Sequence, residues 1–140
     1  MFFDEIIFKE MTNNSLGKQT FNNNVELFNS QDGFMYGNMF KNEYKGYKDY
    51  KVAKLSATNE KGQMLLKIYE YDFALNDLSL YLDLHPEDKN VYELFKVYSE
   101  KERNLVSEYE KRYGPLELDN TTYENYDWYK GPWPFEGVNL

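Results

Sequence analysis

The sequence contains no cysteine and only one histidine among its 140 residues. Without cysteine it has no disulfide framework, no thiolate nucleophile and no Cys-ligated metal site. The single histidine, His85, excludes every site that needs two imidazoles and leaves one candidate for a His-dependent triad. No phosphate-binding glycine loop, nucleophile elbow or zinc-ligand spacing occurs either. We therefore expect no enzymatic activity and no cofactor.

Long apolar runs are absent as well. No run approaches the ~18 residues of a membrane-spanning helix, and the mean hydropathy is −0.81. The first five residues, MFFDE, lack the basic stretch of a secretory signal. We expect one domain of a soluble, acidic protein of the cell interior, with no membrane partner.

Acidic and aromatic residues are abundant. The chain has 24 acidic and 16 basic residues, a net charge of −8, and its 14 Tyr and 10 Phe predict a small, aromatic-rich core. Residues 41–57 are the exception in charge, with five lysines and two acidic residues. Residues 1–33 are rich in asparagine and show no sustained period, which is typical of a poorly ordered arm or of one that orders on a partner.

A Tyr-Lys pair recurs every three residues in the basic stretch, beginning at Tyr44, Tyr47 and Tyr50. This period predicts either a polyproline-like strand with the tyrosines on one edge or an irregular strap. Bases stack on tyrosine and lysine contacts phosphate. The net charge of +3 inside an acidic chain, without any nucleic-acid-binding motif, instead favours a strap over an acidic protein surface.

Residues 58–113 carry the clearest periodic signal. Apolar residues at helical spacing form one seam, which consists of Met64, Ile68, Tyr71, Leu75, Leu78 and Leu82. The apolar stripe of the next stretch consists of Val91, Leu94, Phe95, Tyr98, Leu105, Val106 and Tyr109. Thr58 or Asn59 can cap the first helix, and Pro86 suits the first position of the second. Gly114-Pro115 is a strong stop signal.

The fold class that follows is all-α, an antiparallel two-helix hairpin (about 59–84 and 86–113) with extended, aromatic-rich arms. The expected organisation is an N-terminal arm over residues 1–57, the hairpin over 58–113 and a C-terminal arm over 114–140. A second apolar row lies nearly opposite the seam of the first helix, so one partner helix cannot cover both. The row consists of Leu66, Tyr69, Phe73, Leu80 and Leu84.

The C-terminal arm holds both tryptophans, Trp128 and Trp133. Pro132 and Pro134 exclude helix and central strand, so Trp133 and Phe135 stand on a stiff, extended segment. Such aromatic side chains either anchor a partner or fold back on the protein's own second row. The partner-binding residues predicted on this reasoning are Leu66, Phe73, Leu80, Leu84, Tyr44, Tyr47, Tyr50, Trp128, Trp133 and Phe135.

One cluster of Asp72, Asn76, Asp83 and His85 invites a metal or catalytic interpretation, since paired carboxylates can perform acid–base or metal chemistry. Di-metal helical bundles need Glu-x-x-His pairs from two helices, and the sequence has none. A structural role for these residues is favoured, and a carboxylate metal-binding helical protein is the lesser alternative. No metal-ligating or catalytic residue is assigned.

Three stretches closely resemble the CotJB-type bacterial spore coat proteins, within a match of about residues 60–137. They are DFALNDLSLYLDLHPED at 72–88, YEKRYGPL at 109–116 and GPWPFE at 131–136. Phe135 stands where such proteins most often have Trp. Residues 33–55 are similar to the CotJA-type coat peptide, through GNMF at 37–40 and the Tyr-Lys pairs, but lack its prolines.

The resemblance implies synthesis in the cytoplasm of a sporulating cell and a structural role in assembling the inner spore-coat layers. It also implies association with a manganese-catalase-like coat protein. The alternative is an adaptor for such an enzyme outside the coat. Association of the chain with itself is left open, and the resemblance supplies no catalytic residue.

Overall fold

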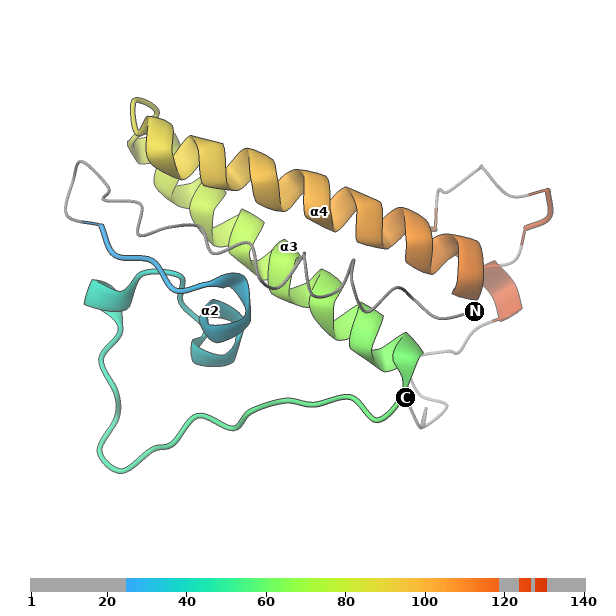
Figure 1. The fold of residues 1–140 in the computed structure, drawn as a ribbon, viewed down its shortest axis with the longest axis horizontal. Helices are drawn as coiled ribbons and strands as arrows, with labels where there is room; N and C mark the ends of the chain where they lie inside the picture. Colours follow the sequence, from blue (N-terminus) through green and yellow to red (C-terminus); the bar gives the residue numbers. More distant parts are fainter. Residues whose placement is uncertain (1–24, 119–123, 127, 131–140) are drawn as a thin grey trace, which may run out of the picture.

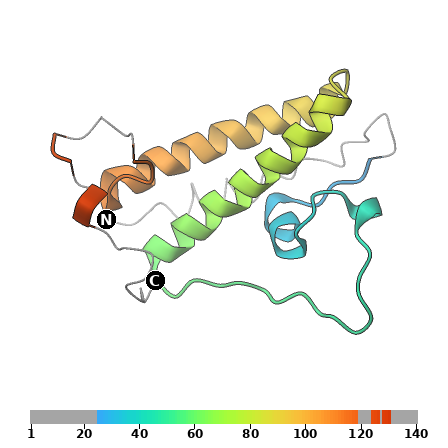
Figure 2. The same cartoon turned by 180° about the vertical axis from the view of Figure 1, so that it is seen from behind.

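The computed structural model describes residues 25–118, 124–126 and 128–130. Two long helices, α3 (Glu60–Leu84) and α4 (Lys89–Tyr113), lie antiparallel and side by side (Figures 1 and 2). A short helix, α2 (Ser30–Tyr36), packs against α3. Two 3-10 turns, η1 (Lys41–Glu43) and η2 (Trp128–Lys130), complete the described elements. The described residues contain no strand, only a bridge between Leu27 and Phe40, so the all-α class is confirmed.

The prediction of a two-helix hairpin with an extended N-terminal arm is wrong in one respect, because α2 is a third helix. The Asn29 side chain accepts a hydrogen bond from the Asp32 backbone N–H at 2.7 Å and donates one to the Asp32 carboxylate at 2.9 Å. Gly37 ends the helix in the left-handed region, with φ 69°. These local caps specify a helix of 7 residues, which is too short to show an apolar period.

The long helices begin where their caps place them. The Asn59 side chain accepts from the Gly62 backbone N–H at 2.7 Å, close to the predicted start. The second helix begins at Lys89 rather than at Pro86, because Asp88 is its cap. The Asp88 carboxylate accepts from the Val91 backbone N–H at 3.2 Å and from the Tyr81 hydroxyl at 3.0 Å. Pro86 therefore lies in the turn between the helices.

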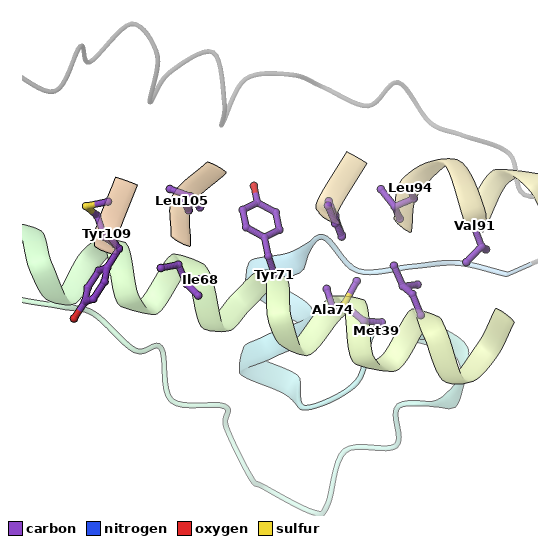
Figure 3. Packing of buried hydrophobic residues seen from close by; sticks show 11 residues of the cluster. Met39, Ile68, Tyr71, Ala74, Val91, Leu94, Leu105 and Tyr109 are labelled. Atoms are coloured by element: carbon purple, nitrogen blue, oxygen red, sulfur yellow. The ribbon is translucent and has the colours of Figure 1, made fainter. Parts of the chain in front are cut away.

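The core lies along the contact between α3 and α4 and extends under α2 (Figure 3). Its buried apolar residues are Met39, Met64, Ile68, Tyr71, Ala74, Leu78, Val91, Leu94, Tyr98, Leu105 and Tyr109. Two members of the predicted seam, Leu75 and Leu82, are only half-buried, whereas Ala74, which the seam did not include, is fully buried. Met39 is fully buried, and its backbone N–H donates to the Asp77 carboxylate at 2.8 Å.

The basic stretch, which we call the strap and define as residues 44–55, is irregular. It contains a turn in which the Tyr50 backbone N–H donates to the Tyr47 carbonyl at 2.9 Å. Lys48 in this turn has φ 44°. A continuous polyproline-like strand requires φ near −75° at every residue. The structure therefore matches the irregular alternative.

Candidate functional site

The outer side of α3 carries exposed leucines. Leu80 and Leu84 are 58% and 79% exposed. Residues four apart lie on the same face of a helix, so these two side chains form one apolar pair. Tyr69 is exposed about three turns before Leu80 on the same side. Tyr69 and this leucine pair are the part of the predicted second row that the described residues leave open to solvent.

Asp83 borders the leucine pair, and Asp72 lies about two turns before Leu80 on the same side of α3. Asp72 and Asp83 are exposed, as is Asn76 between them. Partial burial, and next the charge of Asp72, raise the pKa of Glu102 on α4. The negative field of Asp72 thus extends to the neighbouring helix. We call the surface formed by Tyr69, Asp72, Asn76, Leu80, Asp83 and Leu84 the outer face of α3.

The other predicted members of the row are covered to a greater extent. Leu66 and Phe73 are half-buried. The ring of Phe34, from α2, packs edge-on against that of Phe73, with 6.0 Å between the ring centroids. The structure therefore supplies part of the cover that the second row requires, and it comes from α2.

The predicted aromatic anchors fall into two groups. Tyr44 is half-buried, because its ring packs against Tyr36 at 4.8 Å and Phe28 at 6.5 Å. Tyr47 and Tyr50 are 72% and 63% exposed. Trp128 is half-buried in η2. The predicted anchors Trp133 and Phe135 lie outside the described residues.

The sequence analysis did not predict a polar cluster that lies under α2. Ser30 and Glu70 are buried, and Lys67 pairs with the Glu70 carboxylate at 2.7 Å. Burial raises the pKa of Tyr71 to about 12, with smaller contributions from Tyr98 and Glu70 and an opposing one from a hydrogen bond with the Ser30 side chain. Burial likewise raises the pKa of Tyr98. The cluster fastens α2 to both long helices, and no sequence period marks it.

Asp72, Asn76, Asp83 and His85 do not come together as one set of ligands in the structure. Within the part of the chain that the structure describes, no group of three or more His, Asp or Glu side chains is arranged to hold a metal ion. The His85 ring packs on Tyr81, with 4.5 Å between centroids, and its Nδ1 lies 3.9 Å from the Glu87 carboxylate. His85 thus closes the turn between α3 and α4. No described helix is long and apolar enough to cross a membrane.

No curated protein and no solved structure matches the chain. The family model described as CotJB protein matches residues 62–136. This stretch contains all of α4 and nearly all of α3, with the leucine pair on its outer face. Because the match covers more than half of the 140 residues, the chain belongs to the CotJB family of spore coat proteins.

Proposed function

We propose that this protein is a non-enzymatic structural component of the inner spore-coat layers and that it binds other coat proteins through the outer face of α3. The exposure of Leu80 and Leu84 carries this proposal. Removing a leucine side chain from water contributes roughly 1.5–3 kcal/mol. Two adjacent leucines on one rigid helix can therefore anchor a partner without any rearrangement of the core.

The strap and the aromatic residues Trp128, Trp133 and Phe135 of the C-terminal arm are the second part of the proposed binding surface. The exposed rings of Tyr47 and Tyr50 add apolar area, and the lysines beside them suit an acidic protein surface. We assign Trp133 and Phe135 the same anchoring role. Among the partners we include the manganese-catalase-like coat protein that the sequence resemblance implies. Any manganese in such an assembly then belongs to that partner.

Co-purification from sporulating cells tests the proposal. The tagged chain is compared with a double variant, Leu80→Gln and Leu84→Gln, and the proteins that it retains are identified by mass spectrometry. A matched control is Leu118→Gln, because Leu118 is 60% exposed but lies outside α3. Circular dichroism checks that all three chains keep their helices.

The wild-type chain and the Leu118 control should retain the same coat proteins. The double variant should lose them by about tenfold or more, since both anchors are removed. Equal recovery by the double variant, or no coat protein retained by the wild-type chain, would contradict the proposal.

A further inference from the structure

Two exposed surfaces of this chain have complementary charge. The strap carries four lysines and one aspartate, with the exposed apolar side chains Tyr47, Tyr50 and Leu55 among them. The outer face of α3 carries Asp72 and Asp83 beside exposed Leu80 and Leu84. At 100° per residue, the six residues of this face lie within an arc of about 120°. Each surface thus combines apolar side chains with charges of one sign.

Neither surface pairs its charges with opposite charges within the described residues, although the Lys48 Nζ lies 5.2 Å from the centroid of the Tyr47 ring. No ion pair there involves a lysine of the strap, Asp72 or Asp83. Every residue from 45 to 51 is exposed, and the strap runs apart from the long helices in both views (Figures 1 and 2). Its attachments are at its ends, where Tyr44 packs on Tyr36 and the Leu55 backbone N–H donates to the Met35 sulfur at 3.3 Å.

In this structure the strap does not lie on the outer face of its own α3. Residues 45–51 are all exposed, and so are Leu80 and Leu84, so neither surface covers the other within one chain. The lysines and tyrosines of the strap nevertheless complement the carboxylates and leucines of the face. A second copy of the chain offers both surfaces uncovered.

We propose that the strap of one copy binds the outer face of α3 of a second copy, with the strap lysines paired to Asp72 and Asp83 and with Tyr47 and Tyr50 packed on the leucine pair. This inference rests on the proposed function, and it names the partner of that surface. Because the two surfaces differ, each bound copy still offers one free strap and one free face. A contact of this kind propagates from copy to copy and suits the growth of a layer.

Charge reversal on the full-length chain tests this contact. One variant carries Lys48→Glu and Lys51→Glu in the strap, and the other carries Asp72→Lys and Asp83→Lys on α3. A control carries Lys89→Glu and Lys111→Glu, since both lysines are exposed on α4 and the change in charge equals that of the strap variant. Sedimentation velocity at about 0.05 M and about 0.5 M salt measures self-association, because salt screens contacts between exposed charges.

Wild type and control should associate at low salt and dissociate at high salt. Each reversal variant alone should associate more than about tenfold more weakly, because like charges then face each other. An equimolar mixture of the two reversal variants should associate again, since strap and face are complementary once more. A chain that contacted only a different protein would not show this rescue.

A monomeric wild-type chain at low salt, or reversal variants that associate as the wild type does, would overturn the self-association proposal. Failure of the mixture to associate would overturn it as well. These results leave the co-purification experiment to decide separately whether the outer face of α3 binds other coat proteins.

Discussion

Gly33 is the point of closest approach between α2 and the chain that returns beneath it. Gly33 is buried, and a Cβ at this position would overlap the Sδ of Met39. Met39 is itself fully buried and its backbone N–H is bound to Asp77, so its side chain would have to shift inside the core. Because Gly33 has a hydrogen where alanine has a methyl group, α2 can pack closely on Met39.

Replacing this glycine should loosen α2. Gly33→Ala should lower the free energy of unfolding by about 1–3 kcal/mol, the range for overpacking a filled core. Gly46→Ala in the strap is the control, since its Cβ would lie at an ordinary 3.9 Å from the Tyr44 ring. Urea unfolding followed by circular dichroism measures both. Equal effects of the two substitutions would contradict the packing described for Met39.

The buried tyrosines make a second prediction at this scale. The pKa of Tyr71 is about 12 in the folded chain, against about 10 in an unfolded chain. The folded state therefore holds the Tyr71 hydroxyl proton more tightly than the unfolded state does. The contribution of this group to the stability of the fold is fully present below pH ~10 and is lost as the pH rises toward ~12. Urea unfolding between these pH values should show a smaller loss of stability for Tyr71→Phe than for the wild type. Equal losses would contradict the burial of this hydroxyl group.

At the scale of elements, the long helices follow from sequence and α2 does not. The apolar period and the stop at Gly114 locate α3 and α4 closely. α2 has 7 residues with Gly33 in the middle, so its intrinsic helix propensity is weak. Whether this segment is helical therefore depends on its packing against α3. The hydrogen bonds of Ser30 with Tyr71 and Tyr98 join α2 to distant parts of the chain, and no local sequence pattern specifies such contacts.

The start of α4 provides a test of this element. Asp88→Ala removes both the cap on the Val91 N–H and the bond from the Tyr81 hydroxyl, so it should cost at least about 1–2 kcal/mol of unfolding free energy. Asp88→Asn keeps an acceptor oxygen and should cost less. Asn59→Ala removes one exposed cap of α3 and is the comparison for thermal or urea unfolding. A loss for Asp88→Ala no larger than that for Asn59→Ala would contradict the assigned double role.

At the scale of the whole molecule, the sequence predicted which residues are apolar on the outside of α3 but not how many remain exposed. The sequence places Leu66 and Phe73 in the same apolar row as Leu80 and Leu84. In the structure Phe34 packs on Phe73, and Phe34 belongs to α2, a helix that the apolar periodicity does not predict. The exposure of a side chain on α3 depends on which other segment packs over it. That packing depends on contacts between segments that are far apart in the sequence. The role of Leu80 and Leu84 in binding stays a prediction.

The amount of this protein deposited in the coat tests that role most directly. The measurement compares coat extract with whole sporulating cells, by quantitative immunoblot, for the wild-type chain, the Leu80→Gln/Leu84→Gln variant and Leu118→Gln. The double variant should accumulate in the cells and be reduced in the coat by about tenfold, while Leu118→Gln is deposited as the wild type is. Deposition of the double variant at the wild-type level would contradict assembly through the outer face of α3.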